Sequence, residues 1–140
     1  MMSVTGIPAY DRLAVELPKE FAVFISAVKT NGGIVKPTMK LPRDMMAYFF
    51  PRKRRFYYDP ERMTVLDRMH EQQHLAICIR RGNWKTRDGQ VWRDERAAYS
   101  FEHALGMREG FSTEYMDFLA RRIEYYQSRI SAARAASPFP

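Results

Sequence analysis

The sequence is short of cysteine, since Cys78 is the only one among 140 residues. A single cysteine excludes an internal disulfide framework and indicates a reducing, intracellular compartment, for which a mitochondrial location would be one setting. Long apolar runs are also missing: "FAVFISAV" and "MMAYFF" fall far short of the ~18 residues that a membrane-spanning helix needs. The first residues carry no basic segment followed by an apolar one, so we expect neither a secretory signal nor a transmembrane span.

Most motifs of catalysis are absent as well. The seven glycines are scattered, which leaves no phosphate-binding loop, and the sequence has neither a nucleophile elbow nor a paired-cysteine metal site. These absences favour a protein that is not an enzyme and that carries no cofactor.

The charge is concentrated in one place. The net charge is +7, from 23 basic and 16 acidic residues, and the run Arg52, Lys53, Arg54 and Arg55 supplies four of these charges. The other 136 residues hold 19 basic and 16 acidic groups, a net of only +3. This distribution differs from that of a general nucleic-acid coating protein, which is basic throughout.

Apolar residues make up 46% of the chain, which predicts one globular domain over residues 1–140. The pattern predicts a mostly α domain of four to five helices, with one short β-hairpin and extended proline-rich arms. The helices are expected over 18–30, about 60–80, about 94–105 and from 112 onward. The predicted arms are residues 1–17, a basic and aromatic arm at 48–60, and a tail at 132–140.

The connecting segments are predicted from proline and glycine. Residues 34–42 should be extended because they contain two prolines, whereas 43–50 could form one or two helical turns. Residues 83–92 resemble a hairpin in which Gly89 is left-handed and Trp84 lies opposite Trp92. Gly106 is expected to end the helix that begins near 94.

The last helix has a heptad pattern. Ser112 is a suitable N-cap, and apolar residues follow at spacings of 3, 4, 3 and 4. Two interpretations remain open: this face packs on the domain's own core, or it docks on a partner helix. The residues of the face are Met116, Leu119, Ile123, Tyr126 and Ile130.

Residues 70–74 read H-E-x-x-H, the motif of zinc proteases. That chemistry requires His70 and His74 on one helical face, with Glu71 as the base for a metal-bound water. No third ligand follows at a familiar spacing, and Gln72 and Gln73 fit the motif poorly. The distant candidates for a third ligand are His103, Glu102 and Glu109.

The two histidines also resemble the H-x-x-x-H element of DinB-like iron or zinc bundles, which take further ligands from other helices. The sequence contains no convincing second element of that kind. The simpler interpretation places His70 and His74 at the boundary between core and solvent. We therefore expect no bound metal; if one is bound, its ligands would be His70, His74 and His103.

The segment "YFFPRKRRFYY" has the most unusual composition in the chain. Cations beside aromatic rings suit RNA or single-stranded nucleic acid, and they equally suit an anionic membrane surface. They could also form an arm whose rings enter a core while its charges are solvated, and "PRKRR" could be a nuclear-localisation signal. The expected contact residues are Tyr48, Arg52, Lys53, Arg54, Arg55, Phe56, Tyr57 and Tyr58.

The sequence thus favours a non-catalytic, basic accessory subunit of a large multi-protein assembly that contacts RNA or anionic phospholipid. A respiratory-chain complex, a mitochondrial ribosome or a phage particle would suit, and the other partners would be protein subunits. The alternatives are a metal-dependent hydrolase that uses residues 70–74 and a free-standing nucleic-acid-binding module.

Overall fold

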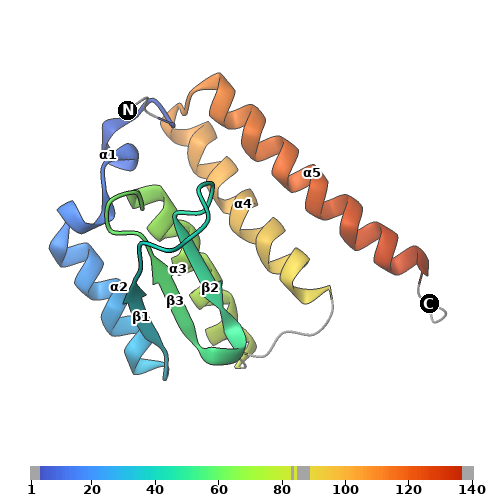
Figure 1. The fold of residues 1–140 in the computed structure, drawn as a ribbon. Helices are drawn as coiled ribbons and strands as arrows, with labels where there is room; N and C mark the ends of the chain where they lie inside the picture. Colours follow the sequence, from blue (N-terminus) through green and yellow to red (C-terminus); the bar gives the residue numbers. More distant parts are fainter. Residues whose placement is uncertain (1–3, 83, 85–88, 137–140) are drawn as a thin grey trace. The chain divides into compact units, whose positions relative to one another are not determined.

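The computed structural model describes residues 4–82, 84 and 89–136, and the chain divides into two compact units, residues 1–85 and 86–140 (Figure 1). The first unit combines helices with a small sheet, whereas the second is a pair of helices. The described residues form five α-helices and three strands, so the predicted mostly α class is confirmed.

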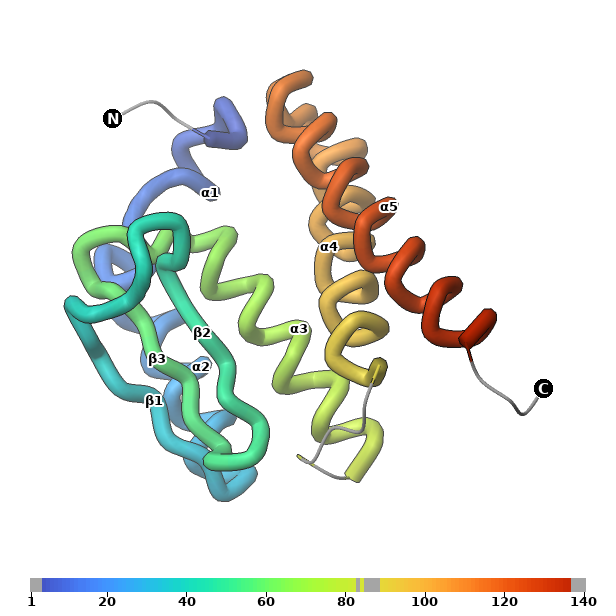
Figure 2. The backbone as a smooth tube through the Cα atoms, turned by 45° about the vertical axis from the view of Figure 1, so that its right-hand side comes forward, coloured from blue at the N-terminus to red at the C-terminus, as the bar shows by residue number. Residues whose placement is uncertain are grey.

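The first unit contains a three-stranded sheet in the order β1-β3-β2. Strand β3 pairs in parallel with β1 and antiparallel with β2, and it lies between them in both views of the backbone (Figures 1 and 2). The elements of this unit are α1 (Pro8–Asp11), a 3-10 turn (Ala14–Glu16), α2 (Pro18–Thr30), β1 (Ile34–Pro37), β2 (Ala47–Phe50), a 3-10 turn (Pro51–Lys53), β3 (Arg55–Tyr58) and α3 (Val65–Arg81).

Helix α2 has the bounds that the sequence predicts. Pro18 occupies its first position, where a missing N–H costs nothing, and Asn31 follows its last residue. Its buried side chains are Phe21, Phe24 and Val28, which recur at helical spacing. These three residues supply one layer of the core.

Helix α3 begins later than predicted. The backbone N–H of Asp67 donates to the hydroxyl of Thr64, and the N–H of Thr64 donates to the carboxylate of Asp67, so this capping box starts the helix at Val65 rather than near 60. The Asp59 carboxylate, just before the predicted start, instead accepts from the N–H of Glu61 within a turn. The predicted end near 80 agrees with the structure, in which Arg81 is the last helical residue and Gly82 is the left-handed C-cap.

The core of the first unit lies between the sheet and the helices α2 and α3. Phe56 of β3 is 1% exposed, and its ring meets those of Phe24 at 5.4 Å and Phe49 at 4.2 Å. Leu75 and Cys78 of α3 complete the same cluster. Both helices therefore cover one face of the sheet.

Two local predictions in the first unit and its boundary were wrong. Residues 47–50 form strand β2 rather than a helical turn, because alternate side chains pair with β3 and the Phe49 ring stacks on Phe56. The predicted hairpin at 83–92 falls partly on residues 83 and 85–88, which lie outside the described part of the chain. Its second half is wrong, because Trp92 lies in the first turn of a helix. A hairpin does form, but between β2 and β3.

One arginine organises the segment before β2. The Arg62 guanidinium donates to the backbone carbonyls of Leu41, Pro42, Arg43 and Met45, and its Nε donates to the Asp59 carboxylate at 2.7 Å. That hydrogen bond, followed by one from the N–H of Glu61, holds the pKa of the Asp59 carboxyl below its usual range. Two nitrogens of one side chain thus hold four backbone carbonyls of the irregular segment.

The second unit is a helical hairpin of α4 (Gln90–Glu109) and α5 (Thr113–Ala136), which run side by side (Figure 2). Gly110 is the left-handed C-cap of α4, and the hydroxyl of Ser112 accepts from the N–H of Tyr115 at the start of α5, as predicted. Residues 132–136 belong to α5 rather than to an extended tail, and residues 137–140 lie outside the described part.

Gly106 does not end α4, because it lies inside the helix, packed against the side chains of Phe111 and Met116. A Cβ at this position would lie 2.6 Å from the Phe111 ring and would overlap the Met116 sulfur. Glycine is therefore required by packing here, and the helix ends four residues later at Gly110.

The predicted heptad face of α5 is its inward face in the structure. Leu119 and Ile130 are buried, and Met116, Ile123 and Tyr126 are half-buried. Beside this face the Arg122 guanidinium lies over the rings of Tyr99 and Tyr126, which stack at 6.0 Å. Burial, with the Glu95 carboxylate as the next cause, raises the pKa of Tyr126 to about 12.

The first prediction concerns Gly106. In an exposed helix, Gly→Ala would stabilise by about 1 kcal/mol through helix propensity. Gly106→Ala should instead destabilise the protein by about 1–2 kcal/mol, because overpacking against Phe111 outweighs that gain. Denaturant unfolding would measure the difference. A smaller cost of Gly106→Ala in a Met116→Ala background would assign part of the clash to Met116, whereas a more stable Gly106→Ala would contradict the close approach.

The second prediction concerns Leu119, which is 0% exposed. Leu119→Asp should cost about 3 kcal/mol or more, because it places a charge in an apolar seam and removes a buried side chain. Ala120→Asp, on the exposed neighbouring position, is the matched control and should cost only about 1 kcal/mol, from the lower helix propensity of Asp. Equal stabilities of the two variants would show that the seam is not a packing surface.

Candidate functional site

The outer face of the sheet is the side that α2 and α3 do not cover. The strand register aligns two rows across it, because directly paired residues point to the same face. The first row is Lys36, Tyr57 and Tyr48, and the second is Ile34, Arg55 and Phe50. We call these six residues the outer sheet face; together they present three rings and two cations.

The turn between β2 and β3 carries the remaining cations. Pro51 begins a single 3-10 turn, and Arg54 ends it with φ 53°, in the left-handed region that favours glycine. The N–H of Arg54 donates to the carbonyl of Pro51 at 3.0 Å, which closes the turn. Arg52, Lys53 and Arg54 are exposed as a result. The tip of the hairpin is therefore cationic.

The rings of the outer sheet face lie close to one another and to cations. The Tyr48 and Phe50 ring centroids are 6.1 Å apart, and the Lys53 ammonium lies 5.5 Å from the Phe50 centroid. Tyr48 is 40% exposed, whereas Phe50 and Tyr57 are half-buried. Such rings are available to a planar ligand but are held in place by their neighbours.

Positive charge surrounds the central ring of the face. The Arg55 guanidinium donates to the Tyr57 hydroxyl at 3.3 Å. This hydrogen bond is the main cause of a lowered pKa of the Tyr57 phenol; partial desolvation opposes it, and the charges of Arg55, Lys53 and Lys36 add to it. The phenol oxygen thus reports a local cationic field, which an anionic ligand would also experience.

The structure separates the residues that the sequence grouped as one contact surface. Tyr48, Tyr57 and Arg55 lie on the outer sheet face, and the exposed turn holds the other three cations. The prediction that Phe56 contacts an anionic partner was wrong, because its side chain lies in the core. Tyr58 is also turned to that side, where its ring meets Phe21 at 5.0 Å. The reason is the period of two along a strand, which sends neighbouring rings to opposite faces.

Three residues of the outer sheet face were not among the predicted contacts: Ile34, Lys36 and Phe50. Phe50 was seen only as part of the aromatic run. Strand alternation in "IVKP" predicts that Lys36 and Val35 point to opposite faces of a sheet. Only the register shows that Lys36 lies beside Tyr57. That pairing joins segments about twenty residues apart in the sequence.

All of the net charge belongs to the first unit. Residues 1–85 hold 15 basic and 8 acidic groups, whereas residues 86–140 hold 8 of each. The second unit is neutral despite its arginines. The cationic character of the protein is therefore a property of the unit that contains the sheet.

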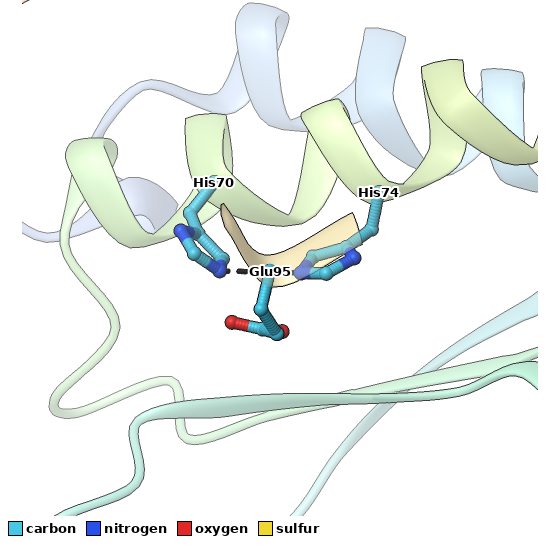
Figure 3. Close-up of side chains that lie close together, drawn as sticks. All are labelled: His70, His74 and Glu95. Atoms are coloured by element: carbon cyan, nitrogen blue, oxygen red, sulfur yellow. Dashed lines mark hydrogen bonds between the residues drawn. The ribbon is translucent and has the colours of Figure 1, made fainter. Parts of the chain in front are cut away.

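The predicted metal residues lie on two different helices. His70 and His74 are one turn apart on α3, and their Nε2 atoms are 3.2 Å from each other (Figure 3). His103, which the sequence offered as a third ligand, lies on α4 in the second unit, with Glu102 and Glu109. The structure thus brings the H-E-x-x-H pair together as its spacing predicts.

Among the described residues, no helix is both long enough and apolar enough to cross a bilayer.

Comparison of the chain with protein-family models, with curated proteins and with solved structures found no match.

The third prediction tests the field at Tyr57. Replacing Arg55 by Gln removes the main hydrogen bond and a nearby charge, so Arg55→Gln should raise the pKa of the Tyr57 phenol. Ultraviolet titration with a Tyr57→Phe parent would isolate this phenol. Arg52→Gln makes the same charge change on an exposed neighbour and should shift the pKa much less. Equal shifts in both variants would show that only net charge matters.

Proposed function

We propose that the protein is a non-catalytic RNA-binding subunit of a larger assembly and that the outer sheet face binds single-stranded RNA. The observation that carries this proposal is the register, which places Tyr48 and Tyr57 beside each other with Lys36 and Arg55 around them. A ribonucleoprotein such as a mitochondrial ribosome is the setting that fits best, with other protein subunits as neighbours.

The rings provide the first half of the interaction. Unpaired bases stack on aromatic side chains, and each stacked base contributes about 1–3 kcal/mol whatever its identity. Strand geometry spaces successive outward residues by about 6.6 Å and neighbouring strands by about 4.8 Å. Tyr48, Phe50 and Tyr57 therefore form a compact platform on a rigid support.

The cations provide the second half. Lys36 and Arg55 flank the rings within the face, and Arg52, Lys53 and Arg54 extend the positive surface at the hairpin tip. Each Lys or Arg that neutralises a phosphate releases counterions, which favours binding at low salt. A path for the phosphates beside a platform for the bases is the usual arrangement for single-stranded nucleic acid.

The geometry favours RNA over a membrane surface. Interfacial binding requires apolar side chains that penetrate about 5–10 Å into the headgroup region. Here Phe50 and Tyr57 are half-buried within a sheet face, and the protruding tip carries three cations rather than rings. A base needs only one open ring face, as on Tyr48, which is 40% exposed, whereas bilayer insertion needs apolar side chains that project beyond the surface.

The fourth prediction separates stacking from charge. Tyr48→Ala and Tyr57→Ala should each weaken binding to a single-stranded RNA by roughly 5-fold to 100-fold, because each removes one stacking ring. Tyr125→Ala, at an exposed tyrosine of the neutral unit, is the matched control and should leave the affinity unchanged. Fluorescence anisotropy would measure these affinities.

The charge component is tested by replacing Arg52, Lys53, Arg54 and Arg55 with Gln. The salt dependence of RNA binding should fall by a slope of up to roughly 3, since single strands contribute about 0.7 per phosphate contact. The control replaces four exposed arginines of the second unit by Gln: Arg93, Arg108, Arg121 and Arg134. The two variants carry the same net charge.

Binding measurements with duplex RNA and with phospholipid vesicles distinguish single-stranded RNA from the alternative partners. Duplex RNA should compete poorly, because its bases are not available for stacking. Strong binding to phosphatidylserine vesicles without binding to RNA would replace the proposal by a lipid surface. Equal effects of the two quadruple variants on RNA affinity would show that the outer sheet face has no special role.

A further inference from the structure

The histidine pair on α3 is not used by the proposed RNA surface. The spacing of four residues puts His70 and His74 on consecutive turns of the helix, and their Nε2 atoms approach to 3.2 Å (Figure 3). In this arrangement one Nε2–H donates to the lone pair of the other ring. If the ring that carries this proton holds it on Nδ1 instead, both Nε2 lone pairs become available to one cation.

The separation of the two nitrogens fits a shared metal ion. Histidine nitrogens bind Zn²⁺ at about 2.0–2.1 Å, so two ligands of a tetrahedral ion lie roughly 3.3 Å apart. The observed 3.2 Å is close to that value. Both nitrogens could therefore reach one ion by turning of the rings, without a large change in the distance between them.

Helix α3 holds the pair in place. The Thr64 and Asp67 capping box fixes its start, Gly82 caps its end, and Leu75 and Cys78 anchor it in the core. A ligand pair on a rigid, packed helix loses little conformational entropy on binding. The spacing of the two Cβ atoms is therefore set before an ion arrives.

We propose that His70 and His74 chelate one divalent transition-metal ion through their Nε2 atoms. Imidazole nitrogens suit Zn²⁺, Ni²⁺ and Cu²⁺, whereas Mg²⁺ and Ca²⁺ prefer oxygen ligands. The pair supplies two ligands, so water or another exchangeable donor takes the remaining positions. The site is built from α3 alone; Glu95, labelled in the same picture, belongs to α4 in the other unit.

The proposed metal site is independent of the RNA surface. The His74 ring lies 6.0 Å from the ring of Phe49, which points to the core side of the sheet. Tyr48 and Tyr57 point to the opposite side. Loss of metal binding should therefore leave RNA binding intact, and the two proposals can fail separately.

The test is a titration of the full-length protein with Zn²⁺ and with Co²⁺. Wild type should bind about one equivalent, and its unfolding midpoint should rise with Zn²⁺ concentration because the ion binds the folded state. Co²⁺ should give visible absorption bands that indicate nitrogen ligation. His70→Ala and His74→Ala should each weaken binding at least tenfold, and Mg²⁺ should have no effect.

The third histidine of the sequence gives the matched control. His103→Ala removes an imidazole from the second unit and should retain wild-type metal binding. If an alanine variant fails to fold, His70→Gln and His74→Gln keep a polar side chain of similar size, and circular dichroism would verify their helicity. Absence of binding to wild type, or binding that persists after both substitutions, would overturn the proposal.

Discussion

Strand β3 is hydrogen-bonded on both edges, and this double pairing fixes most of the first unit. It sets β1 and β2 in register at the same time, so the alternation of one strand becomes the alternation of the whole sheet. Phe56 then faces α2 and α3, while Arg55 and Tyr57 face away. A shift of one residue would expose Phe56 and bury a guanidinium, which makes the arrangement strongly specified.

The presence of the long helices and some of their ends could be predicted from the sequence, because these signals are local. Pro18 and Asn31 bound α2, Gly82 ends α3, and Ser112 begins α5, each through contacts within a few residues. The sheet could not be predicted in the same way. The segment 47–50 gains its extended form from pairing with β3 and from Phe49 stacking on Phe56, and neither interaction is visible in four letters.

The candidate sites show the same difference between local signals, which the sequence contains, and tertiary pairing, which it does not. The spacing of His70 and His74 predicts one helical face, and the structure adds only the separation of their nitrogens. Composition alone identifies the basic and aromatic segment, but it cannot assign each ring to one face of the sheet or the other. Tyr57 and Phe56 are neighbours in the sequence and lie on opposite faces of the sheet. Lys36 joins the face from a different strand, and only tertiary pairing could assign it.

The division of charge between the units has a consequence for the kinetics of association. A polyanion attracts residues 1–85, which carry the whole excess of +7, whereas the helical hairpin has no net charge on which this attraction can act. Encounters are thus oriented before any contact forms, since the sheet-bearing unit is drawn in first. The range of this steering is the Debye length, which shortens from about 10 Å at 0.1 M salt to about 3 Å at 1 M. The association rate should therefore depend on ionic strength even where the final contacts are dominated by stacking.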